Sequence, residues 1–396
     1  MIEVAAFGFS FLKIAELVNC SEDIRIHVYL HDSEYEFYKS EIPENCNWIY
    51  PVGSNVRHPT NLIKGKFWKR HQISADLYLL GDDAPLFAFP KRGSKTVFLP
   101  IGFDLTVQPF QKLMLKRSTN YRQKCKRFLI ATTQRSRIRA VDQIWASPFP
   151  VFEDSLRNIR KDIVLKNFVP FPINYKAHNL IYGTKSPFTK FNTLQNKFLV
   201  FFPGRLMLTK SEEDLVTGQT KGVEEAIRGF LKFQANTNCD AKLLLIDNSL
   251  SPDKEKVIEL IRSLGAESSI EWIRSPSQGD RLTNAEMAFL YRDCDVVLGD
   301  FGAGWFGQTA LEAAAHGKPF ITHVDSNFMY SQFKFNPFLI AKTPDEICSQ
   351  LTKLQDSTIV QINYSNEMRR WYENYLSERI VREWFVEKIR EATKLN

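Results

Sequence analysis

The sequence predicts an α/β protein of two domains, each built on a parallel sheet. Three observations support this. The length of 396 residues suits two domains of ordinary size. Short apolar runs alternate with amphipathic stretches in both halves of the chain, and Gly or Pro often ends them. Strands that alternate with helices need crossover connections, which make the sheet parallel. Such sheets bind ligands at the carboxyl ends of their strands.

The C-terminal half has the clearer pattern. The run 198–202 is apolar and closed by Pro203-Gly204, as expected of a buried strand. Apolar residues from Val223 to Leu231 then recur at helical spacing. The same reasoning predicts further strands at 242–246, 270–273, 295–298 and 320–322, and further helices at 254–264, 286–291 and 309–315.

The N-terminal half shows a weaker version of the same alternation. We expect strands at 4–7, 24–30, 77–80, 96–99 and 142–146, with a helix at 11–18 after the Gly8 turn. A tail helix over 368–394, broken near Ser377, has no strand after it and must pack on a domain already built. We therefore predict a Rossmann-like domain at 1–180, a second at 197–365 and a bridging helix at 366–396, with the boundary near 175–197.

Three segments of the second half are suited to binding a diphosphate. Gly204-Arg205-Leu206 follows a strand directly, and Lys221-Gly222 opens a helix. An Arg at a strand's carboxyl end and a Lys at a helix N-terminus supply positive charge. The third segment runs from Gly304 to Pro319. Each segment alone is better explained as ordinary structure, but their order at successive strand ends favours a site.

The third segment places a glycine turn before a helix. Such a turn lets a phosphate approach the backbone N–H groups of Gly307, Gln308 and Thr309 closely. Glu312 falls in the first turns of that helix, where a carboxylate can accept the two hydroxyls of a ribose. The alternative is that Glu312 is a solvated helix residue.

Residues 197–325 resemble the donor domain of the retaining glycosyltransferases of family 4 (glycosyl transferases group 1), which have the GT-B fold. The matching residues are the G-R-L and K-G motifs, Phe306-Gly307, Leu311-Glu312-Ala313, Ala315, Gly317 and Pro319. The resemblance implies two Rossmann-like domains facing a cleft, with the last helix crossing back to the first domain. It also implies that Arg205 and Lys221 hold the donor diphosphate and that Glu312 holds the ribose.

The sequence departs from the family pattern in three places. Gly304 stands where the family has the first Glu of its E-x7-E pair, so we expect Asp300 to replace that catalytic carboxylate. Lys210 has the more usual spacing from Arg205, but we prefer Lys221 because the helix starts there. The first domain lacks the family's His, and Gly102-x-Asp104 resembles the motif that follows it. Asp104 is therefore a candidate contact for the acceptor or the sugar, with an Asx turn as the alternative.

The resemblance implies transfer of a sugar from a nucleotide-sugar donor to the hydroxyl of a glycan or lipid-linked acceptor, in the synthesis of cell-surface polysaccharide. It implies retention of anomeric configuration. We expect no metal and no cofactor, because the six cysteines lack zinc spacing and the basic pair can neutralise the diphosphate. The alternatives are a sugar-nucleotide epimerase or a phosphorylase on the same fold, and a nucleic-acid-binding protein.

The charge of the chain, +7 overall, is unevenly distributed. Residues 105–141 contain no Asp or Glu, and 112–139 hold ten Lys or Arg. Three interpretations of this stretch are open: a solvated helix surface, a surface that contacts an anionic membrane, or a surface that binds nucleic acid. The scarcity of aromatic residues there, Tyr121 and Phe128 apart, argues against nucleic acid. We expect a cytoplasmic protein that can associate with the inner face of a membrane.

Overall fold

The structure, a computed structural model, divides the chain into two compact units. The first contains Met1–Pro170 and Glu378–Asn396, and the second contains Phe171–Ser377. The residues described are 1–8, 10–39, 42, 46–52, 73–87, 90, 95–116, 120–188, 191–194, 196–208, 214, 218, 220–248, 251–277 and 281–394. Within these ranges, no helix has the length and hydropathy needed to cross a bilayer.

The first unit is built on a six-stranded sheet in the order β3-β2-β1-β4-β5-β6, and every neighbouring pair is parallel. Its strands are β1 (Ile2–Phe7), β2 (Ile24–Leu30), β3 (Ile49–Pro51), β4 (Leu77–Leu80), β5 (Lys95–Phe98) and β6 (Gln143–Ile144). The β4 side chains are all buried, as expected of a strand covered on both faces.

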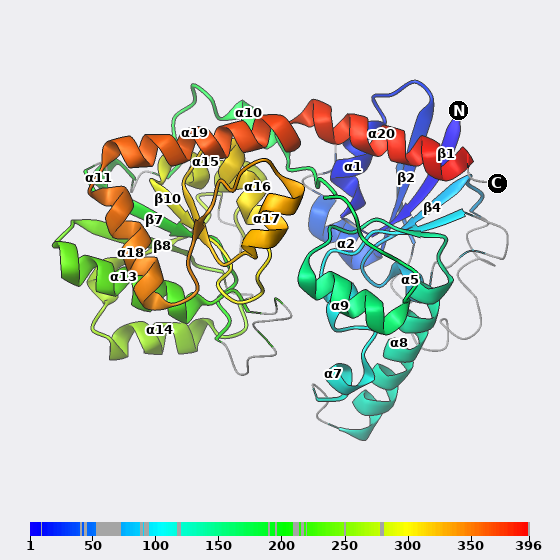
Figure 1. Cartoon of the computed structure of the whole chain (residues 1–396), viewed down its shortest axis with the longest axis horizontal. Coiled ribbons are helices and arrows are strands. Elements are labelled where there is room, and N and C mark those ends of the chain that lie inside the picture. The colour runs from blue at the N-terminus through cyan, green and yellow to red at the C-terminus, as the bar shows by residue number, and fades with distance from the viewer. Residues whose placement is uncertain are drawn as a thin grey trace. The chain divides into compact units, whose positions relative to one another are not determined.

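Helices flank this sheet (Figure 1). They are α1 (Phe11–Val18), α2 (Asp32–Tyr38), α5 (Ala84–Phe87), α6 (Phe103–Thr106), α7 (Gln111–Lys116), α8 (Tyr121–Ala140), α9 (Pro150–Ile159) and the final helix α20 (Glu378–Lys394). α1 and α20 pack together, and Trp145 lies edge-on to Trp384 of α20 with ring centroids 5.7 Å apart. The final helix is thus part of the core of the first unit.

The second unit repeats this architecture with the sheet order β12-β11-β10-β7-β8-β9, again entirely parallel. Its strands are β7 (Phe198–Phe202), β8 (Ala241–Ile246), β9 (Ile270–Ile273), β10 (Val296–Leu298), β11 (Phe320–Thr322) and β12 (Leu339–Ile340). β7 lies between β8 and β10, so the loops after these three strands emerge side by side.

Figure 1 shows helices on both faces of this second sheet. The helices are α10 (Tyr175–Leu180), α11 (Phe191–Leu194), α13 (Val223–Thr237), α14 (Lys254–Ser263), α15 (Asn284–Asp293), α16 (Gln308–Ala315), α17 (Ser326–Gln332), α18 (Pro344–Gln355) and α19 (Thr358–Tyr375). The apolar side of α13, including Ile227 and Phe230, packs into one core with β7 and β8 residues such as Val200 and Leu243. This packing fixes the strand ends that carry the site.

The predicted architecture is confirmed: two α/β units with parallel sheets, and a last helix that joins the first unit. The tail helix breaks at Leu376 and Ser377, close to the expected position. The chain enters the second unit at Phe171, ahead of the predicted boundary region. The sequence patterns missed the short edge strands β3 and β12. They also missed several helices, namely α2, α5, α6, α7, α9, α10, α11, α17 and α18.

Candidate functional site

The loop after β7 and the start of α13 meet at the carboxyl edge of the second sheet. A Cβ added to Gly204 would lie 3.1 Å from Lys221 Cβ and only 2.4 Å from the Phe202 ring. Only glycine fits there, so the backbone beside Arg205 passes directly against Lys221. The two cationic residues predicted from separate motifs are therefore brought to one place by a close backbone approach.

Arg205 is exposed, and among the described residues its guanidinium makes no hydrogen bond or ion pair. The loop that carries it is nevertheless anchored. Asp253, just before α14, donates its backbone N–H to the Leu206 carbonyl at 3.2 Å, and its carboxylate accepts the Leu208 N–H at 3.2 Å. A fixed loop thus presents a cation that is available to an anionic ligand.

Lys221 is paired with Asp300. Its Nζ lies 2.7 Å from Asp300 Oδ2, and the Asp300 side chain is only 6 % exposed. Gly222, with φ of 72°, allows the chain to turn from Lys221 into α13, and a Cβ there would lie 2.9 Å from Phe301 Cβ. The predicted diphosphate lysine and the predicted catalytic carboxylate are therefore direct neighbours.

The glycine turn 302–307 leads into α16, which follows β10. Phe306 holds this turn in the core, with its ring edge-on to Trp371 at 5.3 Å. Gln308, at the start of the helix, donates its side-chain amide to the Pro172 carbonyl at 3.3 Å. The first N–H groups of α16, from Gln308 and Thr309, have no partners within the helix, and N–H groups in this position are suited to binding an anion.

Glu312 is partly buried on α16 beside the fully buried Tyr291 of α15. Burial, and then the charge of Glu312, raise the pKa of the Tyr291 hydroxyl well above its usual range. Tyr291 therefore stays protonated and faces the carboxylate. This arrangement holds Glu312 one turn inside the helix whose N-terminus is suited to a phosphate.

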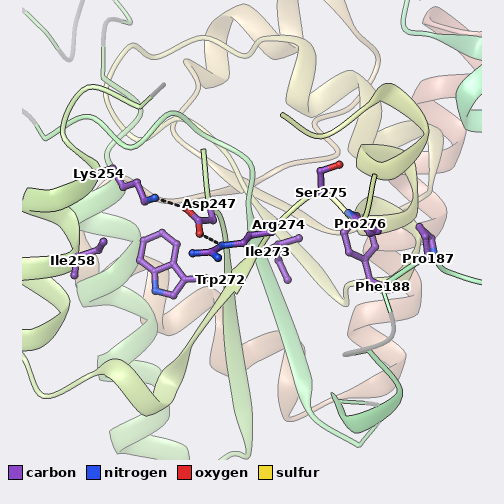
Figure 2. A pocket seen from close by; sticks show the side chains of 10 residues that line it. All are labelled: Pro187, Phe188, Asp247, Lys254, Ile258, Trp272, Ile273, Arg274, Ser275 and Pro276. Carbon is purple, nitrogen blue, oxygen red and sulfur yellow. Dashed lines mark hydrogen bonds and ion pairs between the residues drawn. The ribbon is translucent and has the colours of Figure 1, made fainter. Parts of the chain in front are cut away.

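A pocket of about 600 Å³ opens at the ends of β8 and β9 (Figure 2). Its lining includes Trp272, Arg274 and Ser275 on and after β9, Lys254 from α14, and Phe188 from the segment before β7. Lys254 directly follows Asp253, whose contacts anchor the Arg205 loop. The pocket lies at the end of β8, the strand beside β7, and it offers an aromatic ring together with charged groups.

Asp247 forms ion pairs with two cationic residues of this pocket. Lys254 Nζ lies 2.5 Å from its Oδ1, and the Arg274 guanidinium contacts its other oxygen, as Figure 2 shows. Burial alone would raise the pKa of Asp247, but the hydrogen bonds from Lys254 and Arg274 hold it below its usual value. The Arg274 side chain remains 80 % exposed, so it can still meet a ligand.

A buried histidine pair links the far end of α16 to α10. His178 Nδ1 and His316 Nε2 are 2.7 Å apart, and both residues are less than a tenth exposed. The Tyr291 ring stacks on His316, with ring centroids 6.3 Å apart. Burial, then the neighbouring His178, Lys318, Arg369 and Arg292, lower the pKa of His316 to about 3. His316 is therefore neutral in the folded protein at neutral pH.

This lowered pKa makes stability pH-dependent. The unfolded chain binds a proton at His316 below about pH 6.5, whereas the folded chain does so only near pH 3. We expect the free energy of unfolding to fall as the pH decreases from about 7 towards 3, by at most about 1.4 kcal/mol per pH unit. Urea unfolding at pH 7.5 and pH 5 measures this, with His316→Gln as the comparison. If the variant loses as much stability between these pH values as the wild type, His316 is not the group responsible.

Asp104, the other predicted catalytic residue, lies in the first unit. It is 3 % exposed, and its carboxylate accepts the N–H groups of Ile101 and Gly102 at 3.1 Å and 2.9 Å. Burial, and then the charge of Asp82, raise its pKa well above the usual value. These bonds run back to residues before Asp104, whereas the Asx-type turn named as the alternative bonds an N–H that follows the side chain. Contact with acceptor or sugar stays a prediction.

The structure brings Gly204, Arg205, Lys221 and Asp300 together. Gly307, Gln308, Thr309 and Glu312 lie at the start of α16, the helix that follows β10. Lys210 lies outside the described residues. The sequence patterns missed the pocket residues Asp247 and Arg274. Each follows a buried strand directly, and this position was the available signal. Nothing in the sequence linked Phe188 to them.

Comparison with known proteins identifies the class of fold. No protein-family model matches the sequence, and no curated protein matches it. Solved structures that align with nearly the whole of both chains include those of three proteins. Anabaena HepE in complex with UDP and glucose has a TM-score of 0.65 at 13 % identity, covering 99 % of this chain and 100 % of HepE. Sucrose-phosphate synthase from Thermosynechococcus elongatus has a TM-score of 0.66 at 10 % identity, covering 99 % of each chain.

The third structure is WaaG, a glycosyltransferase involved in lipopolysaccharide biosynthesis. Its TM-score is 0.61 at 12 % identity, covering 98 % of this chain and 99 % of WaaG. Structural similarity at such low sequence identity shows a shared fold, and it does not by itself show a shared activity. The chain therefore has the two-domain GT-B fold of these glycosyltransferase structures.

Proposed function

We propose that this protein transfers a glycosyl group from a nucleotide sugar to an acceptor hydroxyl, with retention of anomeric configuration. One observation carries the proposal: the close approach of Gly204 to Lys221 puts two cations together in the connection between β7 and α13, and β10, the strand beside β7, leads into the N-terminus of α16. A diphosphate needs this combination of charge and backbone N–H groups. The structures of HepE, which contain UDP or UDP-glucose, support a ligand of this class.

In the proposed reaction the bond between the anomeric carbon and the diphosphate oxygen breaks, the acceptor oxygen bonds to that carbon, and the hydroxyl proton of the acceptor is released to water. Arg205 and Lys221 stabilise the negative charge that develops on the departing diphosphate. Glu312 accepts the ribose hydroxyls. The pocket of Trp272 and Arg274 takes the nucleobase, because it lies at the end of β8, the strand beside β7, and offers an aromatic face. The acceptor is a hydroxyl of a glycan or a lipid-linked glycan, in cell-surface polysaccharide synthesis.

A ligand screen followed by a transfer assay tests this function. UDP and UDP-glucose at 100 times their dissociation constants would stabilise the fold by about 2.7 kcal/mol, a readable shift in melting temperature. Sugar transfer to glycan acceptors is then measured with and without EDTA, and we expect activity to survive chelation. Complete loss with EDTA, restored by manganese, contradicts the metal-independent assignment. Conversion of the nucleotide sugar without acceptor indicates an epimerase, and a requirement for inorganic phosphate indicates a phosphorylase.

The basic stretch 112–139 suggests where the enzyme works. In α8, Arg122, Lys124 and Lys126 are exposed near the helix start, beside the exposed rings of Tyr121 and Phe128. Other basic residues of the stretch make contacts within their own unit. Arg139, for example, donates its Nε–H to the Ile159 carbonyl at 2.9 Å. We propose that the start of α8 binds the anionic inner face of a membrane, where lipid-linked acceptors reside.

Vesicle flotation measures this membrane contact. We expect the protein to float with anionic vesicles at low salt and to be released as salt screens the charges. Replacing Lys124 and Lys126 by Gln should reduce recovery several-fold, whereas the same change at Lys232 and Lys353 in the second unit should not. Equal recovery with neutral and anionic vesicles excludes an electrostatic contact.

A further inference from the structure

The ammonium of Lys221 is held on two sides. Asp300 Oδ2 lies 2.7 Å from Nζ, and the Trp305 ring centroid lies 5.5 Å from it. A carboxylate and an aromatic face both attract an ammonium. The Lys221 side chain is 26 % exposed, so part of the ammonium can still reach a ligand. An ammonium has three N–H donors, and Asp300 uses one of them.

Asp300 itself is fixed and cannot follow the lysine. Its other oxygen, Oδ1, accepts the backbone N–H groups of Gly302 at 2.9 Å and Ala303 at 3.2 Å. Its carbonyl accepts the Thr322 hydroxyl and the His323 N–H, each at 2.8 Å. The carboxylate therefore keeps its position when a ligand attracts Lys221, and a negative charge stays beside the diphosphate.

This fixed charge acts unequally on donor and product. Transfer of the sugar leaves a nucleoside diphosphate that carries more negative charge than the nucleotide sugar did. A carboxylate that stays in place repels the more highly charged product more strongly. It also competes with that product for the ammonium of Lys221.

We propose that Asp300 is a positioning residue and counter-ion for Lys221, which orients the ammonium for the donor and weakens retention of the nucleoside diphosphate. The proposal rests on the proposed function. It assigns Asp300 an action through Lys221, in place of the direct contact with the sugar that its sequence position suggests.

Asp300→Asn removes the charge but keeps an oxygen that can accept the loop N–H groups. Isothermal titration with UDP should give about tenfold tighter binding to this variant, equivalent to about 1.4 kcal/mol. Binding of UDP-glucose should tighten less, and turnover should fall because product release slows. Asp300→Glu, which keeps the charge, should bind UDP as the wild type does. If the Asn variant does not fold, Asp300→Ser provides the same comparison, since its hydroxyl can also accept the loop N–H groups.

Asp325→Asn is the matched control. Asp325 also caps a nearby turn, accepting the Phe328 N–H at 2.8 Å, and the contacts of the described residues include no ion pair between it and Lys221. Equal tightening in both Asn variants would show a general charge effect and overturn the proposal. Unchanged or weaker UDP binding in folded Asp300→Asn overturns it as well, while leaving the proposed function intact. If the wild type binds neither UDP nor inorganic pyrophosphate, the proposed function fails and this role fails with it.

Discussion

Replacing Arg205 or Lys221 by alanine is expected to weaken binding of a nucleoside diphosphate by about ten- to a hundred-fold each. Charged hydrogen bonds contribute about 1.5–3 kcal/mol, and each 1.4 kcal/mol is a factor of about ten in affinity. Arg205→Ala is the cleaner test, because no ion pair of the guanidinium is present among the described residues. Isothermal titration with UDP measures the loss, and a melting curve confirms that each variant is folded.

Lys232→Ala serves as the control for loss of a positive charge from this unit. Lys232 is half exposed and pairs with Asp345, so its removal should leave UDP binding unchanged. Lys210→Ala tests the assignment of the lysine itself. Loss of binding in Lys210→Ala, together with normal binding in Lys221→Ala, would show that Lys210 holds the diphosphate.

Glu312→Gln is expected to weaken binding of the nucleotide-sugar donor by about tenfold or more, with a smaller effect on turnover. The carboxylate would accept two ribose hydroxyls, and an amide offers only one oxygen for them. Gln is close in shape to Glu and can still face the Tyr291 hydroxyl, so the packing of α15 against α16 should survive. Titration with UDP and with inorganic pyrophosphate separates the roles, since pyrophosphate lacks the ribose and should bind the variant normally.

Glu224→Gln provides the matched control for this experiment. Glu224 lies in the first turn of α13 and pairs with Arg228 at the surface. Its replacement should change neither UDP nor pyrophosphate binding. Normal UDP affinity in folded Glu312→Gln would show that Glu312 is a structural helix residue, the alternative weighed from the sequence.

The strands of the second unit were predictable because their signals are local. The run at 198–202 is apolar, short and closed by Pro203-Gly204, and the structure has a strand at the same position. The strand β3 was not predictable in this way. It has three residues, two of them exposed at the sheet edge, so burial leaves little periodicity in its sequence. Charged residues lie around much of the surface of α8, so its apolar residues do not recur at the helical spacing that would predict the helix from sequence.

The sequence by itself determined the alternation of strands and helices and the order of the G-R-L, K-G and glycine-turn segments along it. Each of these depends on residues within one turn or one strand. Only the tertiary structure decided that Lys221 pairs with Asp300, 79 residues away, and that Lys254 and Arg274 converge on Asp247. These contacts arise where crossover connections bring separate strand ends to one edge of a sheet. Because such pairs are set by sheet order and leave no periodic pattern in the sequence, they became visible only in the folded chain.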